Sequence, residues 1–306
     1  MLIAGAVAAC CISTGTAADA ATAAAGSSAA AQSQSHRGQP GGEYDYYLAL
    51  GDSLAWGYQP NSAGVGIQSG HGYADDLAAY LRQHGNRRLD YVNLSCPGET
   101  TGTMLDGGCP DLAGSGQKYA VQVDAAAAFL KAHPHARILV TLDIGANNVD
   151  DCMSGGTLDA TCVTAGVTAA GTQLPEILAE LKAAAGRHVS FVGMNYYDPF
   201  LAEWLTGSSG QTLADESVAL STTFNGVLGA GYAAFGIPVA DVSGAFDTAD
   251  FTDTTSLGGM TVPVNVANIC EWTWMCAPAP IGPNIHANDT GYAVIARTFE
   301  TLLRRY

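Results

Sequence analysis

The sequence predicts an α/β domain in which helices cover both faces of a five-stranded parallel sheet. From about residue 43, short apolar runs bounded by Gly, Asn or Asp alternate with longer segments whose apolar residues recur at helical spacing. No internal repeat or second domain boundary interrupts this alternation. Alternating strands and helices form parallel sheets, and five strands suit a doubly wound, flavodoxin-like order. We therefore expect one three-layer α/β/α domain over residues 43–306.

The individual elements follow from the apolar pattern. In the first expected helix, Leu77, Tyr80 and Leu81 share one face. By contrast, the stretch 252–280 shows no clear helix. The expected strands are 46–50, 89–94, 138–144, 188–195 and 238–242. The expected helices are 73–83, 119–132, 174–185, 218–235 and 289–305.

Residues 1–42 differ in composition from the domain. An apolar stretch at residues 2–9 is followed by a segment rich in Ala, Ser, Thr and Gly. This pattern is typical of an export signal with a flexible linker, so we expect a secreted protein. Cys10 follows Val-Ala-Ala, which leaves lipid anchoring at the cell surface through Cys10 as the alternative. No later stretch reaches the roughly 18 apolar residues that a membrane span needs.

The charge of the chain argues against several classes of partner. The formal net charge is −16, and only three of the 306 residues are lysines. Such a chain repels phosphate backbones and anionic lipid surfaces, so we expect no nucleic-acid binding and no attachment to anionic membranes. Nothing in the sequence indicates an obligate protein partner, and we expect a monomer.

The cysteines indicate disulfide bonds. Cys10 and Cys11 lie in the leading segment, and an even number of cysteines in the remainder of an exported chain implies disulfides. None of the spacings is C-x-x-C, so we expect no zinc site. Six cysteines allow 15 pairings, but their local spacing favours three short loops, each contributing roughly 2–4 kcal/mol. The expected bonds are Cys96–Cys109, Cys152–Cys162 and Cys270–Cys276.

Polar and glycine residues gather where the expected strands end. The first four strands are followed by GDSLAWG, SCPGETT, GANNVDD and NYYDPF. In a doubly wound sheet, ligands bind at the carboxyl ends of the strands. This edge of the sheet is therefore the predicted functional edge.

Ser53 and His286 are candidates for nucleophilic catalysis. Acyl transfer by a serine needs a hydroxyl on a tight turn, a base that takes its proton, and donors for the developing oxyanion. Ser53 lies where the first strand turns into a helix, although taken alone this GDS is better explained by Asp52 or Ser53 capping that helix. His286 lies in a polar loop before the last helix, and His71 is the second candidate base.

Four sequence blocks, in this order, resemble the SGNH/GDSL hydrolase family. They are YYLALGDSLAWGYQP, CPGETT, TLDIGANN and IHANDTGY, and the resemblance covers nearly all of residues 44–306. More narrowly, the blocks are similar to those of secreted actinobacterial esterases and lipases, which also carry three sequential disulfides. The resemblance implies the SGNH hydrolase fold and ester hydrolysis without a metal or a cofactor.

The resemblance also implies a role for each matching residue. Ser53 would be the nucleophile, and His286 would be the general base and then the acid for the leaving alcohol. The Ser53 N–H, the Gly98 N–H and the Asn147 side-chain amide would form the oxyanion hole. The alternatives are structural, because Gly98 can simply supply a positive φ and Asn147 can be a turn residue.

Two positions depart from the family pattern. Asn148 stands where the family often has an Asp that is mainly structural. More important, Pro283 occupies the position of the usual triad acid, three residues before His286. Our hypothesis is that the backbone carbonyl of Pro283, or one close by, accepts the imidazole N–H and orients the ring. Alternatively, the Asp289 carboxylate swings in.

The sequence thus predicts a secreted serine ester hydrolase, an esterase or lipase whose substrates are small esters or lipids with an apolar acyl group. Tyr196, Tyr197 and Pro199 are expected to edge the cleft, and residues 272–275 either bind acyl chains or cover a small core cluster. One alternative is a deacetylase of polysaccharides or other acetyl esters. The other is a non-catalytic SGNH-like module that binds lipid or glycan.

Overall fold

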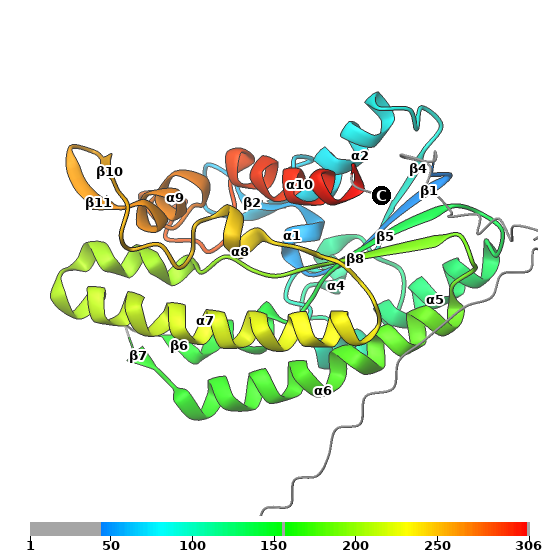
Figure 1. Cartoon of the computed structure of the whole chain (residues 1–306), viewed down its shortest axis with the longest axis horizontal. Coiled ribbons are helices and arrows are strands. Elements are labelled where there is room, and N and C mark those ends of the chain that lie inside the picture. Colours follow the sequence, from blue (N-terminus) through cyan, green and yellow to red (C-terminus); the bar gives the residue numbers. More distant parts are fainter. Residues whose placement is uncertain (1–43, 155–156, 305–306) are drawn as a thin grey trace, which may run out of the picture. The chain divides into compact units, whose positions relative to one another are not determined.

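A five-stranded parallel sheet forms the centre of the computed structural model, which describes residues 44–154 and 157–304 (Figure 1). Its order, β4-β1-β5-β8-β9, is the predicted doubly wound order, with the first strand of the sheet between the second and the third. The predicted export segment, 1–42, lies outside the described residues. The strands are β1 (Tyr46–Gly51), β4 (Asp90–Asn93), β5 (Ile138–Asp143), β8 (Val189–Met194) and β9 (Val239–Ala240).

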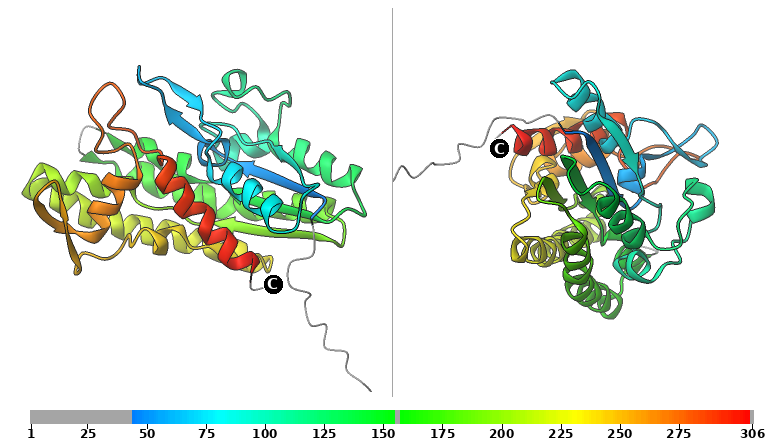
Figure 2. Two further views of the ribbon diagram at one scale, coloured as in Figure 1. Left: turned by 90° about the horizontal axis from the view of Figure 1, so that it is seen from above. Right: turned by 90° about the vertical axis from the view of Figure 1, so that its right-hand side faces the viewer.

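Helices cover both faces of this sheet, which confirms the predicted three layers (Figures 1 and 2). Strand β1 is consequently apolar on both sides, and Tyr47–Leu50 have no exposed surface. One face carries α2 (Tyr73–Gln83) and α10 (Asp289–Leu303), and the other carries α5 (Gln122–Ala132), α6 (Ala160–Ala184) and α7 (Ser208–Ala234).

Shorter elements occupy the connections between these strands and helices. The short helices are α1 (Ser53–Trp56), α3 (Thr101–Asp106), α4 (Leu112–Ser115), α8 (Val242–Ala245) and α9 (Val264–Trp272). The 3-10 turns are η1 (Ala146–Asn148), η2 (Asp150–Cys152) and η3 (Pro199–Thr206). Three hairpins pair β2 (Tyr58–Pro60) with β3 (Gly66–Gln68), β6 (Met153–Ser154) with β7 (Thr157–Leu158), and β10 (Thr254–Leu257) with β11 (Met260–Pro263).

The structure departs from the sequence prediction in three helices. Helices α6 and α7 begin about ten or more residues earlier than predicted, because their first halves are rich in Ala, Gly, Ser and Thr and show little apolar periodicity. The prediction that 252–280 contains no helix is wrong, since α9 forms there. Val266 and Ile269 of α9 are buried, so this stretch contributes to the core.

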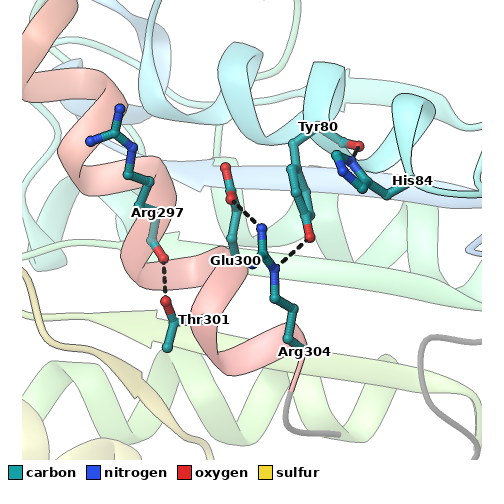
Figure 3. Close-up of polar contacts among 6 residues, drawn as sticks. All are labelled: Tyr80, His84, Arg297, Glu300, Thr301 and Arg304. Atoms are coloured by element: carbon teal, nitrogen blue, oxygen red, sulfur yellow. Dashed lines mark hydrogen bonds and ion pairs between the residues drawn. The ribbon is translucent and has the colours of Figure 1, made fainter.

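The last helix is fixed against α2 by aromatic stacking and a polar cluster. The rings of Tyr73 and Phe299 stack with centroids 4.9 Å apart. Near the surface, Arg304 donates a 2.8 Å hydrogen bond to the Tyr80 hydroxyl and lies 3.4 Å from the Glu300 carboxylate (Figure 3). Solvent screens this exposed ion pair, so the buried rings contribute most of the stabilisation at this contact.

Three disulfides form, and they are the three predicted pairs. Cys96–Cys109 closes the loop that follows β4, Cys152–Cys162 joins η2 to the first turn of α6, and Cys270–Cys276 joins α9 to the next loop. Each bond therefore fixes a segment at the carboxyl edge of the sheet or next to it. Among the described residues, no helix combines the length and apolar character that a membrane crossing requires.

Candidate active site

The fold brings Ser53 and His286 into contact, although 233 positions separate them in the chain. Ser53 is the first residue of α1, directly after β1, and the Asp52 carboxylate caps this helix by accepting from the Leu54 N–H at 2.9 Å. The His286 Nε2 atom lies 2.8 Å from the Ser53 Oγ atom. The cap and the nucleophile interpretations of GDS are therefore compatible, because the cap sets the direction of the serine.

Asn284, rather than Pro283, orients the imidazole. The Asn284 Oδ1 atom lies 2.7 Å from His286 Nδ1 and also accepts from the His286 backbone N–H at 3.0 Å. Because that N–H is a donor, the side-chain atom facing it is the carbonyl oxygen, and Nδ1 therefore carries the proton. Nε2 then presents its lone pair to Ser53, which is the tautomer that a general base needs.

The hypothesis that the Pro283 carbonyl orients His286 is thus corrected by one residue. The Asn284 side chain turns toward His286, two residues later in the chain, through a local turn. The backbone carbonyl of Pro283 does not contact the imidazole. The alternative with Asp289 is also not realised, because its carboxylate accepts from the Gln59 amide at 2.6 Å. His71, the second candidate base, is exposed on the loop before α2 and does not contact Ser53.

Neighbouring aromatic residues hold the histidine loop in place. The Tyr58 ring stacks on the His286 ring with centroids 4.0 Å apart, and the Tyr197 hydroxyl donates to the Ile285 carbonyl at 2.7 Å. Burial lowers the pKa of His286 to about 3. The imidazole is therefore neutral at physiological pH and able to accept a proton.

We expect Asn284→Ala to lower kcat roughly 100-fold, since a misoriented base loses much of its contribution. Asn284→Asp places a negative charge beside the imidazole and raises the pKa of His286, so the acid limb of the kcat/KM profile moves to higher pH. Steady-state kinetics between about pH 3 and pH 9 measures both effects. Asn288→Ala is the matched control, because the Asn288 side chain caps α10 and donates to the Glu271 carbonyl without contacting the imidazole. A wild-type kcat in Asn284→Ala would show that another group orients the ring.

The three predicted oxyanion donors, Ser53, Gly98 and Asn147, follow β1, β4 and β5 at the carboxyl edge of the sheet. Among the described residues, no group accepts a hydrogen bond from the Ser53 N–H or the Gly98 N–H. Gly98 has φ +81°, the left-handed conformation that favours glycine. The Asn147 Nδ2 atom donates one hydrogen to the Glu99 carbonyl at 2.9 Å, which fixes the amide and leaves its second hydrogen available.

Gln122, which the sequence reasoning missed, links the serine turn to the loop after β4 that carries Gly98 and Glu99. Its carboxamide accepts from the Gly51 N–H at 2.7 Å and donates to the Gly51 carbonyl at 3.0 Å, as a neighbouring strand would. The same Nε2 donates to the Glu99 carboxyl at 2.7 Å. Because Glu99 also receives the Asn147 amide, one chain of hydrogen bonds connects the ends of β1, β4 and β5. A lone Gln at the start of an apolar helix is the sequence signal that could have identified it.

Glu99 belongs to one cluster with metal-ligating residue types among the described residues, together with Cys96 and Cys109. The two sulfurs form a disulfide, whereas metal ligation by cysteine requires thiolates. The cluster is therefore structural.

Two buried carboxyl groups lie beneath the serine. Asp52 and Asp143 interact with each other, and both are fully or almost fully buried. Burial, together with the neighbouring Asp52 charge, raises the pKa of Asp143 well above its ordinary value, and burial also raises the pKa of Asp52. Tyr73 donates to Asp143 and Tyr196 donates to Asp52, at 2.7 Å and 2.8 Å. The two carboxyl groups and their tyrosine donors thus support the helix cap that carries Ser53.

We expect the folded protein to lose stability as pH rises from about 4 to 8. Burial raises the pKa of Asp143, and it raises that of Asp150 to about 8. The folded chain thus binds more protons than the unfolded chain in this window, and the free energy of unfolding falls by up to about 1.4 kcal/mol per pH unit for each extra proton. Denaturant unfolding between pH 4 and 8 measures the slope. Asp143→Asn should reduce the slope and the exposed Asp253→Asn should not. Equal slopes in all three proteins would contradict the raised pKa of Asp143.

A largely apolar cavity opens beside Ser53. It encloses about 840 Å³ of empty space, part of it open to solvent, and Ser53, Asn147 and His286 lie on its wall. Tyr196, Tyr197 and Pro199 also line it, as the sequence predicted. Trp272 and Met275 instead pack against the core, so residues 272–275 supply no wall here. The main apolar lining residues are Val149, Met153, Leu158, Val163, Val167 and Phe224.

Residues 49–294 match the family model for the GDSL-like lipase/acylhydrolase family. Two solved structures show the same fold. An extracellular lipase from Streptomyces rimosus has 18% sequence identity and a TM-score of 0.52, and the match covers 84% of this chain and 98% of the lipase. Phospholipase A1 from Streptomyces albidoflavus NA297 has 17% identity and a TM-score of 0.50, covering 84% of this chain and 99% of the phospholipase. No curated protein matches the sequence significantly.

Proposed function

The chain belongs to the GDSL-like lipase/acylhydrolase family of carboxylic ester hydrolases, and on this premise we propose that it is an exported esterase or lipase that hydrolyses esters through an acyl-enzyme on Ser53. The observation that carries the proposal is the 2.8 Å contact between Ser53 Oγ and His286 Nε2. It is meaningful because the Asn284 carbonyl fixes the proton on Nδ1, so that Nε2 faces the hydroxyl as an acceptor.

The proposed reaction follows from these positions. Ser53 Oγ attacks the ester carbonyl while His286 Nε2 takes its proton, and the resulting oxyanion accepts from the Ser53 and Gly98 N–H groups and the Asn147 amide. The imidazolium then donates its proton to the leaving alcohol. A water molecule, deprotonated by the same imidazole, releases the acid and restores the serine.

The proposed substrates are esters with an apolar acyl group, including lipid esters. Support comes from the cavity wall, where Val163, Val167 and Phe224 border the serine side. Apolar surface of this kind favours an alkyl chain by roughly 0.8 kcal/mol per buried CH₂. The Streptomyces proteins with this fold include a lipase and a phospholipase A1, which is consistent with the proposal.

Export is part of the proposal and rests on the three disulfides. Disulfides persist in oxidising compartments and are rare in the cytosol, and the Streptomyces rimosus lipase with this fold is extracellular. We propose a secreted monomer, with lipid attachment at Cys10 as the alternative. Mass spectrometry of the protein from culture supernatant and from membranes distinguishes the two.

Hydrolysis of p-nitrophenyl esters tests the proposal. Acyl chains of 2 to about 16 carbons should give turnover with a maximum above acetate, and Ser53→Ala should abolish it. A maximum at acetate, together with acetyl release from acetylated xylan, would favour the deacetylase. No turnover at any chain length by a folded protein would overturn the enzyme proposal and favour the binding module.

A further inference from the structure

Two neighbouring segments beside the site carry no charge. They are the β2–β3 hairpin, residues 58–68, and the loop 273–283, which we call together the neutral rim. Neither contains Asp, Glu, Lys, Arg or His, in a chain with 28 acidic and 12 basic residues. The neutral rim is thus a distinct patch on an acidic protein.

The two segments form one surface. They project side by side from the domain in both views of Figure 2. A Cβ atom at Gly64 would come within 2.1 Å of the Pro280 carbonyl oxygen, so the hairpin tip touches the loop directly. The Gly64 φ of +77° also favours glycine at this contact.

The neutral rim is attached to the catalytic histidine from both sides. Tyr58, at the base of the hairpin, stacks on the His286 ring, and its carbonyl accepts from the Tyr292 hydroxyl of α10 at 2.8 Å. On the loop side, the Trp274 N–H donates to the His286 carbonyl at 3.0 Å. Whatever contacts the neutral rim therefore lies next to Ser53 and His286.

Apolar side chains on the neutral rim face solvent. Among the described residues, three large hydrophobic side chains are exposed, and two of them, Val65 at 60% and Ile67 at 44%, lie on this hairpin. Pro278, Ala279 and Pro280 are exposed on the adjoining loop. The third exposed side chain, Met260 at 55%, lies on the separate β10–β11 hairpin (Figure 1).

We propose that the neutral rim docks the enzyme onto lipid surfaces without net charge, and so presents the Ser53 site to aggregated esters. The role of this docking in presenting the Ser53 site rests on the proposed ester hydrolysis. Exposed apolar side chains enter the lipid interface favourably, and the absence of charge avoids desolvating ions there. The chain's net charge of −16 repels anionic surfaces, whereas electrically neutral lipid imposes no such barrier. The occupant is therefore uncharged or zwitterionic lipid.

Binding to phosphatidylcholine vesicles tests the docking independently of catalysis. In the Ser53→Ala background, which leaves the vesicles intact, cosedimentation should show binding, and Val65→Ser with Ile67→Ser should weaken it at least tenfold. Met260→Ser is the matched control and should change it less than twofold. Replacing a third of the lipid by phosphatidylglycerol should weaken binding. Equal losses in both variants, or no loss in the double variant, would overturn the proposal.

Activity measurements separate this proposal from the proposed function. With Ser53 restored, the double variant should hydrolyse soluble p-nitrophenyl acetate within twofold of wild type but emulsified tributyrin at least tenfold more slowly. If wild type hydrolyses neither ester yet binds vesicles, the proposed function fails and the docking stands.

Two further measurements keep the docking test decisive. On vesicle addition, Val65→Trp should show a larger blue shift of emission than wild type, which already carries Trp274 on the neutral rim. Met260→Trp should show no shift beyond that of wild type, so a gain of signal complements the loss in the serine variants. Sedimentation velocity tests whether a second copy of the chain covers the neutral rim instead. If wild type self-associates, the Val65→Ser/Ile67→Ser variant does not, and wild type fails to bind vesicles, the lipid assignment is overturned.

Discussion

Ser53→Ala is expected to reduce kcat by at least about a thousandfold, the scale seen when the nucleophile of a serine hydrolase is removed. The physical reason is that, within residues 44–154 and 157–304, Ser53 carries the one hydroxyl that hydrogen-bonds to His286 Nε2. His286→Ala should reduce kcat by a similar factor. Combining Ser53→Ala with His286→Ala should reduce kcat no further than either substitution alone, because the two residues act as a unit. Hydrolysis of p-nitrophenyl butyrate measures all three.

A phosphonyl adduct on the nucleophile provides a direct readout for the same variant. Wild type treated with a phosphonate ester should gain one adduct by mass spectrometry, on the peptide that carries Ser53, and Ser53→Ala should gain none. Thermal unfolding of the variant should match wild type to within a few degrees, since the helix cap comes from Asp52. Turnover above one tenth of wild type by a folded Ser53→Ala protein would assign the nucleophile elsewhere.

Asn147→Ala is expected to lower kcat by roughly 100- to 1,000-fold with little change in KM, the usual cost of losing one oxyanion donor. The amide is positioned by the Glu99 carbonyl at 2.9 Å and stabilises charge only in the transition state. The neighbouring Asn148→Ala is the matched control. Asn148 hydrogen-bonds Thr101, accepting from its N–H at 3.0 Å and donating to its hydroxyl at 2.7 Å, so we expect a change in stability and less than a tenfold loss of kcat.

Steady-state kinetics and a boronic acid inhibitor together check the role of Asn147. A tetrahedral boronate should bind the Asn147→Ala protein at least tenfold more weakly, because its oxygen occupies the position of the oxyanion. An unchanged kcat, or a loss shared equally by Asn148→Ala, would show that Asn147 is the turn residue that its position after β5 also permits.

The sheet was predictable because the information that defines it is local. Each central strand is an apolar run that ends in or just before Gly, Asn or Asp, and five such strands with right-handed connections suit the doubly wound order that forms. The first halves of α6 and α7 were not predictable in this way. They line the cavity and contact each other, with small residues and threonines in place of an apolar stripe.

The sequence predicted which part of the chain orients His286, but not which atom does so. The sequence shows that Pro283 has no carboxylate, so a carbonyl oxygen was the reasonable expectation. Whether that oxygen belongs to the backbone at 283 or to the Asn284 side chain depends on side-chain torsions. Gln122 was missed for a related reason: its partners, Gly51 and Glu99, come together only when the ends of two strands meet.

The Gln122 bridge has a consequence for how the enzyme responds to temperature. Because its carboxamide joins Gly51 to Glu99, we expect the serine turn and the loop after β4 to move together. Substrate binding then requires no rearrangement between these two segments. We expect the rate to rise smoothly on heating and then to fall together with the cooperative unfolding transition. Inactivation and unfolding curves should coincide, with no inactive folded state between them.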